Sequence, residues 1–183
     1  MNRLIKTGLS LSLIIISLTG YSQKYICKSG ETSFFSETPM EDISALNTKV
    51  VSLINTEDGS LAVKMNIIDF EFPNKLMQEH FNENYLESEK YPKSVFSGKI
   101  LEKIDFSKDG KYKVTGQGNI VIHGQAQKVN LEGTLTVNGD QLILEAAYLI
   151  KPEDYNIEIP SLVITKIAKE ISVKSKFVYN KLS

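Results

Sequence analysis

The sequence predicts a mainly β fold: an antiparallel β-barrel of about eight strands, with one helix at about residues 74–87 inserted in the middle of the chain. Three observations support this fold class. Apolar and polar residues alternate through most of the chain, which is the pattern of strands with one buried face. Turn pairs such as Asp58-Gly59 and Asn138-Gly139 join neighbouring segments as hairpins. Only one stretch, residues 70–96, changes to the spacing of a helix.

The first 22 residues are predicted to be a cleaved signal peptide. Arg3 and Lys6 precede an apolar run at residues 9–18, and Gly20-Tyr21-Ser22 supplies small residues of the kind that a signal peptidase reads. The alternative is a membrane anchor, but the apolar run is shorter than the roughly 20 residues of a spanning helix. We therefore expect a periplasmic or secreted protein without a stable membrane anchor after cleavage, whose single domain comprises residues 23–183.

Charge and cysteine content narrow the function classes. The chain carries 21 basic and 22 acidic residues, and cleavage would remove Arg3 and Lys6, which leaves a net charge of −3. This charge argues against a nucleic-acid-binding surface. Cys27 is the only cysteine, so no disulfide forms within the chain, and we expect it to be a small buried residue of the first strand.

Three strands are expected before the helix: residues 24–38, with a break near Ser29-Gly30, then residues 47–55 and 61–67. In the first of them, Phe34 and Phe35 should point to opposite faces. In the third, the apolar phase moves by one residue at Ile67-Ile68. Because side chains in a strand have a period of two, this slip predicts a β-bulge.

The predicted helix has an apolar face made of Met77, Phe81 and Tyr85, with Leu76 and His80 beside them. Asn74 is its expected N-cap, because an asparagine side chain can accept a hydrogen bond from the first helical N–H groups. Tyr91-Pro92 is its expected end, since the residue before proline disfavours the helical region. A single helix with such a face must cover apolar surface, so we place it over the mouth or the side of the barrel.

Five strands are expected after the helix: residues 95–106, 112–122, 129–137, 141–150 and 162–182. Gly116 and Gly118 lie on one face of the second of these, where they would permit coiling or close approach of the helix. His123-Gly124 is a predicted turn. Residues 151–160 form a loop, and residues 162–170 could equally form a helical turn. Closure of these strands into a barrel would remove the exposed sheet edges.

Several short motifs resemble the YceI-like family of exported bacterial proteins. They are Tyr85-Leu86, Lys90-Tyr91-Pro92, Phe96, Ile120-x-Ile122-His123-Gly124, Val129, Leu131 and Asp154-Tyr155-Asn156-Ile157. The resemblance implies a lipocalin-like antiparallel barrel, which in some members encloses a long polyisoprenoid chain or a related amphiphile. Many members carry an arginine-aspartate pair and a histidine-leucine pair early in the helix. In this chain, Leu76-Met77 and Glu79-His80 take those positions. Any polar role of the family's pairs is therefore not assigned to this chain.

The predicted function is binding of an apolar lipid, such as a polyisoprenoid or an isoprenoid quinone, inside the barrel. An eight-stranded barrel is about the smallest that can hold a ligand. The residues expected to face the lumen or mouth and contact this ligand are Phe34, Met65, Ile67, Phe72, Met77, Phe81, Tyr85, Phe96, Tyr148 and Tyr155. No cofactor and no catalytic residue is predicted, and a homodimer is left open.

Two other function classes are weighed against lipid binding. In one, the barrel is filled and the protein is an exported interaction module or stress-related protein that acts through its helix and residues 151–160. In the other, the barrel is a small enzyme with Tyr85, Glu79 or His80 as acid or base. The two histidines, His80 and His123, lie far apart without cysteine or carboxylate ligands at metal-binding spacing, so no metal site is predicted.

Overall fold

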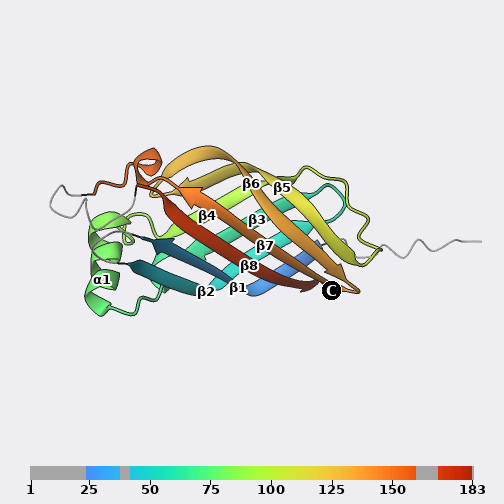
Figure 1. The fold of residues 1–183 in the computed structure, drawn as a ribbon, viewed down its shortest axis with the longest axis horizontal. Coiled ribbons are helices and arrows are strands. Elements are labelled where there is room, and N and C mark those ends of the chain that lie inside the picture. The colour runs from blue at the N-terminus through green and yellow to red at the C-terminus, as the bar shows by residue number, and fades with distance from the viewer. Residues whose placement is uncertain (1–23, 38–41, 160–168, 183) are drawn as a thin grey trace, which may run out of the picture.

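Eight antiparallel strands form one closed barrel in sequence order, and the last strand pairs with the first (Figure 1). The computed structural model describes residues 24–37, 42–159 and 169–182. The strands are β1 (Lys24–Ser36), β2 (Ile43–Asn55), β3 (Ser60–Asn66), β4 (Lys93–Ile100), β5 (Gly110–Ile122), β6 (Gln125–Asn138), β7 (Gln141–Ile150) and β8 (Ile171–Lys181). The predicted antiparallel barrel of about eight strands is therefore confirmed.

Residues in the left-handed backbone region close the predicted hairpins. Gly59, Gly124 and Gly139 have φ angles of 73°, 72° and 57°, a region that glycine enters without steric cost. His123 also has a positive φ, of 49°, and forms with Gly124 the two-residue turn between β5 and β6. The turn chemistry in the sequence thus identified the connections that join β2 to β3, β5 to β6 and β6 to β7.

Two predicted strand features are wrong. The slip at Ile67-Ile68 is no β-bulge, because β3 ends at Asn66 and the chain enters a 3₁₀ turn, Ile67–Asp69 (η1). The strand predicted to run to residue 106 ends at Ile100. Beyond Ile100 the chain makes local turns, in which the Asp105 carboxylate accepts from the Ser107 N–H at 3.1 Å, and such side-chain bonds compete with a strand ladder.

The first and last predicted strands agree in part with the structure. The break near Ser29-Gly30 is a register shift within the single strand β1. Phe34 lines a pocket inside the barrel and Phe35 is exposed, which confirms that they point to opposite faces. Residues 160–168 lie outside the described residues, as do residues 1–22 of the predicted signal peptide.

The helix is shorter than predicted and has two parts. An α-helix, Lys75–His80 (α1), continues as one π-helical turn, Phe81–Tyr85 (η2), and the chain leaves the helical region at Glu87, where φ is 42°. Asn74 is the N-cap, as predicted: its side chain accepts from Leu76 N–H at 3.0 Å and Met77 N–H at 3.4 Å. None of the helices within the described residues has the length and hydrophobicity to span a membrane.

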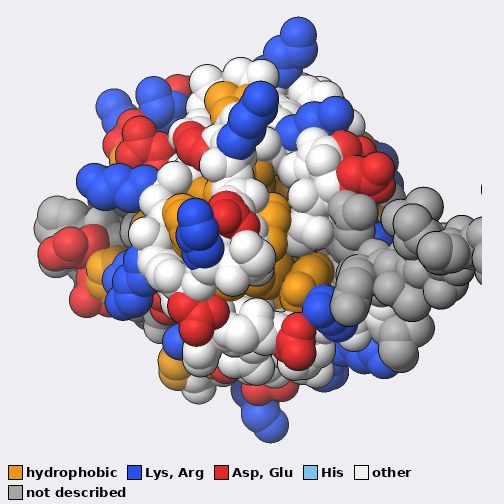
Figure 2. All heavy atoms as spheres, turned by 90° about the vertical axis from the view of Figure 1, so that its right-hand side faces the viewer, with side chains coloured by type: hydrophobic (Ala, Val, Ile, Leu, Met, Phe, Trp, Pro, Cys, Tyr) orange, Lys and Arg blue, Asp and Glu red, His pale blue; other side chains and the backbone are white. Residues whose placement is uncertain are grey.

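The helix lies across one end of the barrel (Figure 1). Leu76 and His80 were expected beside its apolar face, but both are exposed. The apolar stripe that faces the barrel is therefore narrower than predicted: it consists of Met77, Phe81 and Tyr85, which are half-buried and line a pocket. Figure 2 shows the opposite end of the barrel, where apolar side chains at the centre are surrounded by charged ones.

Toward the end opposite α1, the barrel interior is packed with buried side chains. Leu135, Leu142 and Tyr179 are fully buried there. The Tyr179 hydroxyl lies 2.7 Å from Ser52 Oγ, so this buried polar group has a partner. Burial also raises the pKa of the Tyr179 hydroxyl, which keeps it neutral. Cys27 is buried on β1, as predicted.

Glycine permits a close approach between β4 and β5. Gly98 and Gly118 are register partners, and a Cβ atom at Gly118 would lie 2.3 Å from the backbone oxygen of Ser97. No side chain fits at that distance, so the backbone there requires glycine. We expected Gly118 to permit coiling of the strand or close approach of the helix; the structure shows close approach of the neighbouring strand, β4, and not of the helix.

Candidate functional site

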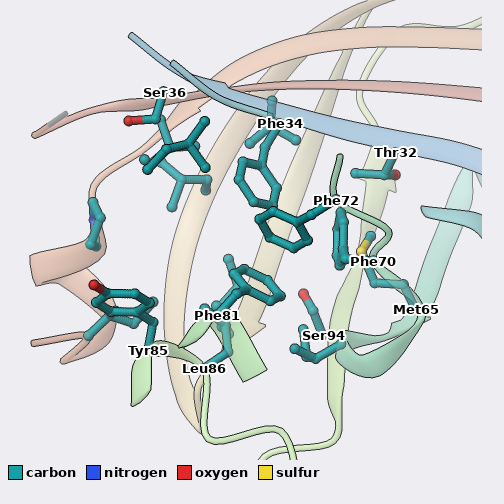
Figure 3. Close-up of a pocket in the computed structure, with 18 of the residues that line it drawn as sticks. Thr32, Phe34, Ser36, Met65, Phe70, Phe72, Phe81, Tyr85, Leu86 and Ser94 are labelled. Carbon is teal, nitrogen blue, oxygen red and sulfur yellow. The ribbon is translucent and has the colours of Figure 1, made fainter. Parts of the chain in front are cut away.

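An apolar pocket lies at the α1 end of the barrel (Figure 3). Its volume is about 170 Å³. Strands, turns and the helix all contribute to its wall. The lining residues are mostly aliphatic or aromatic, and they are Thr32, Phe34, Ser36, Ile43, Met65, Ile67, Phe70, Phe72, Met77, Phe81, Tyr85, Leu86, Ser94, Ile120, Ile122, Tyr148, Ile150, Pro152, Ile157, Ile159, Ile171 and Val173. Among the described lining residues, hydroxyl groups are the only polar side-chain groups.

Four phenylalanine rings from three parts of the chain meet in this pocket (Figure 3). Phe34 comes from β1, Phe70 and Phe72 from the segment after η1, and Phe81 from η2. The Phe81 ring centroid lies 4.9 Å from that of Phe72, 5.5 Å from Phe34 and 5.7 Å from Phe70. Such pairs each contribute about 0.5–1.5 kcal/mol beyond their buried area. We refer to Phe34, Phe70, Phe72 and Phe81 as the aromatic cluster.

The helical segment places three residues on the pocket because they recur every fourth position. Met77, Phe81 and Tyr85 all line it. The π-helical turn begins at Phe81, whose carbonyl accepts from Leu86 N–H at 2.9 Å, and it brings Leu86 to the wall as well. Burial raises the pKa of the Tyr85 hydroxyl, so Tyr85 presents a neutral side chain to the pocket.

Two hydroxyl groups of the pocket, those of Thr32 and Tyr148, are linked through Ser175. Thr32 Oγ1 lies 2.9 Å from Ser175 Oγ, and the Ser175 hydroxyl also bonds to Tyr148. Burial raises the pKa of the Tyr148 hydroxyl, and its bond with Ser175 opposes that rise. The three hydroxyls therefore form a hydrogen-bonded chain across β1, β8 and β7.

Eight of the ten residues predicted to contact a ligand line this pocket. They are Phe34, Met65, Ile67, Phe72, Met77, Phe81, Tyr85 and Tyr148. Phe96 does not, because it points inward at a deeper level of the barrel, where it belongs to the core cluster and lines a smaller inner cavity. Tyr155 is buried in the core cluster beside the pocket, and burial raises its pKa to about 12. Whether any of the eight contacts a ligand stays a prediction.

Sequence reasoning missed several lining residues. Thr32 and Ser36 alternate with Phe34 on one face of β1, so the strand period already carried the signal for them. Phe70 lies in the apolar run after Ile67, next to the predicted Phe72. For Ile157 and Ile159 there was no periodic signal, because they lie in an irregular segment.

The side chain of His123 forms hydrogen bonds to two separate segments of the chain near the pocket. His123, at the β5–β6 turn, is buried, with its Nδ1 atom 3.1 Å from the Tyr155 carbonyl and its Nε2 atom 2.7 Å from Glu87 Oε2. The Tyr91 ring packs edge-on against it, with ring centroids 4.4 Å apart. Both oxygens are acceptors, so the two bonds form together only when both ring nitrogens donate. We expected only a turn residue; His123 joins the segment after η2 to the 3₁₀ turn Pro152–Tyr155 (η3).

Because of the contact between Glu87 and His123, we expect the protein to lose stability in acid. The hydrogen bond from His123, assisted by the charge of Lys90, lowers the pKa of Glu87 below its ordinary value of 4.5. A lowered pKa stabilises the fold above pH 4.5, and this contribution disappears as the pH falls through the folded-state pKa. We expect Glu87→Gln to lower the melting temperature at neutral pH and to match the wild-type protein below that pKa.

The control for this prediction is Glu89→Gln, which makes the same charge change at an exposed neighbour. It should leave the melting temperature unchanged across the same pH range. Thermal unfolding followed by circular dichroism measures both variants. A constant difference between Glu87→Gln and wild type at all pH values would contradict the prediction.

A closed antiparallel barrel with an apolar pocket at one end has the architecture of barrels that hold small apolar molecules. The chain belongs to the YceI-like domain family, because the model of that family matches residues 29–179. The expected family resemblance is thus confirmed. None of the curated proteins matches the sequence.

Solved structures share the fold at low sequence identity. A polyisoprenoid binding domain from Saccharophagus degradans, implicated in plant cell wall breakdown, is 12% identical with a TM-score of 0.74; the match covers 87% of this chain and 99% of that domain. BcnA from Burkholderia cenocepacia is 19% identical with a TM-score of 0.62, covering 81% and 95%. The YceI protein of Campylobacter jejuni is 17% identical with a TM-score of 0.57, covering 98% and 94%.

Proposed function

We propose that this protein binds an apolar lipid, such as a polyisoprenoid or an isoprenoid quinone, in the pocket under α1, and that it sequesters or carries this lipid. The observation that carries the proposal is the chemistry of the pocket wall, whose described residues are aliphatic and aromatic, with hydroxyls as their only polar side-chain groups. The likeness in fold to a domain described as polyisoprenoid binding supports the same ligand class.

The size of the pocket requires the aromatic cluster to move when a long chain binds. Its volume of about 170 Å³ resembles that of an engineered cavity of about 150 Å³ that holds one benzene molecule. A longer chain needs space that the phenylalanine rings now fill. Phe81 lies on a short helical segment, so displacement of α1 and η2 is the simplest way to open the pocket.

Binding energy would then rise with chain length. One isoprene unit has five carbons, and burying them contributes roughly 4 kcal/mol at about 0.8 kcal/mol per carbon. Three units contribute about 12 kcal/mol, against an association cost of about 4–15 kcal/mol. Long chains are therefore favoured over short ones, with little need for recognition of a head group.

The pocket is better suited to binding than to catalysis. Among its described lining residues there is no carboxylate, imidazole, amine or thiol that could act as acid, base or nucleophile. Tyr85 and Tyr148 are neutral phenols, and burial raises the pKa of each. A phenol with a raised pKa is a poor general base near neutral pH.

The proposed site of action is the periplasm or the exterior of the cell. This part of the proposal rests on the sequence of residues 1–22, whose basic start and short apolar run are typical of a cleaved signal peptide.

Native mass spectrometry tests the proposal. The full chain would be expressed in a bacterial host and purified from the periplasmic fraction without detergent, followed by solvent extraction of any bound molecule. We expect the measured mass to correspond to a chain that begins near residue 23. A discrete additional mass should belong to a bound molecule, which solvent extraction recovers as a lipid. A clean apo mass that persists after incubation with isoprenoid quinones and polyprenyl lipids would contradict the proposal. That result would favour an exported interaction module instead.

A further inference from the structure

A second, smaller cavity lies deeper in the barrel, next to the pocket. Its volume is about 50 Å³, and its wall is formed by inward residues from β3 to β8. Four residues line both spaces: Met65, Ser94, Ile120 and Tyr148. These residues form a shared wall, so the two spaces are separated by side chains and not by the backbone of the barrel.

Tyr148 is the largest side chain in this shared wall. Its hydroxyl bonds to Ser175, whose own hydroxyl lies 2.9 Å from Thr32 Oγ1. This hydroxyl chain holds the Tyr148 ring between the pocket and the inner cavity. The other large residue of the wall, Met65, has a flexible unbranched side chain that adapts easily to a neighbour.

The inner cavity has free space beside a glycine. A Cβ atom at Gly116 would lie 3.6 Å from Phe96 Cζ and 3.8 Å from Leu61 Cδ2, which is ordinary van der Waals contact. All three residues line the inner cavity. In contrast to Gly118, whose backbone environment excludes a side chain, Gly116 could carry a methyl group without strain. Glycine at this position thus leaves open space in the inner cavity.

We propose that the inner cavity is a second binding subsite, which receives the far end of a bound hydrocarbon chain, and that Tyr148 sets how deep the chain can reach. The inference rests on the proposed function of the outer pocket. A chain that fills the outer pocket meets the Tyr148 ring, and one that is long enough turns the ring aside and enters the inner cavity. The protein would thereby select ligands by length.

A series of prenyl alcohols of two, three and four isoprene units tests this inference by isothermal titration with the full-length protein. Tyr148→Ala joins the two spaces, so affinity for the longest alcohol should rise about tenfold relative to the shortest. The size corresponds to between one and two additional buried methylenes, at a gain of about fourfold for each. Gly116→Ala adds a methyl group to the inner cavity and should lower affinity for the longest alcohol about fourfold, with the shortest unchanged.

If Tyr148→Ala fails to fold, Gly116→Ala still tests the inference, because it adds only one methyl group at a position where there is room. Leu149→Ala, at an exposed neighbour on β7, is the control and should leave the whole series unchanged. If the wild-type protein binds none of the alcohols, the proposed function fails and the inference fails with it. If the wild type binds them but Gly116→Ala shows the same dependence on length, the inference alone is overturned.

Discussion

Replacing Phe81 with aspartate is expected to abolish retention of an apolar ligand while the barrel stays folded. Phe81 touches three other rings of the aromatic cluster, so this position is central to the pocket. An unpaired carboxylate against apolar surface costs several kcal/mol, and each 1.4 kcal/mol is a factor of ten in affinity. The expected loss of affinity is therefore about a hundredfold or more. Phe81 does not belong to the main core cluster, so the barrel itself should persist.

The matched control is Leu76→Asp. It adds the same charge to the same helical segment, but Leu76 is 57% exposed and does not line the pocket. Extraction of bound lipid measures ligand retention, and circular dichroism with thermal unfolding measures the fold. If Phe81→Asp unfolds the protein, or if it retains as much ligand as Leu76→Asp, then Phe81 is not a separate part of the binding site.

Replacing Leu142 with alanine is expected to cause the largest loss of stability among the substitutions considered. Leu142 is 0% exposed, and it pairs with Tyr179 on β8 and with Val137 on β6 in the core cluster of the barrel. Truncation of a buried leucine costs about 2–5 kcal/mol, because apolar contacts are lost and a cavity remains. For a domain of this size, the melting temperature should fall by roughly 5–15 °C.

Leu149→Ala on the same strand is the control for Leu142→Ala. Leu149 is 60% exposed, so its truncation should change the free energy of unfolding by less than about 0.5 kcal/mol. Urea unfolding of both variants would measure the difference. Similar losses in the two variants would show that this part of the barrel is less tightly packed than the structure indicates.

Local chemistry was enough to predict much of this fold. The strands could be located because apolar alternation follows the two-residue period of extended backbone, and the hairpins because glycine enters the left-handed region freely. Asn74 could be identified as the helix start because its side chain accepts from the first N–H groups. The end of the helix could not be found in this way. The chain turns at Glu87, before Tyr91-Pro92, and Glu87 bonds to His123 on a distant turn.

The candidate site shows where local chemistry stops being sufficient. Alternation assigns both Phe34 and Phe96 to the inside of the barrel, but Phe34 lines the pocket and Phe96 lies deeper, in the core cluster and at the wall of the inner cavity. The period of a strand specifies the face of each residue, whereas its level along the barrel axis depends on strand tilt and stagger.

The sequence by itself therefore determined the strand pattern, the turns and the apolar face of the helix, since each depends on residues close together in the chain. Only the tertiary structure decided which inward side chains leave a pocket, that four phenylalanines from three segments meet in it, and that Gly118 lies against β4. These features depend on the register of strands across the closed barrel, and no short stretch of sequence specifies that register.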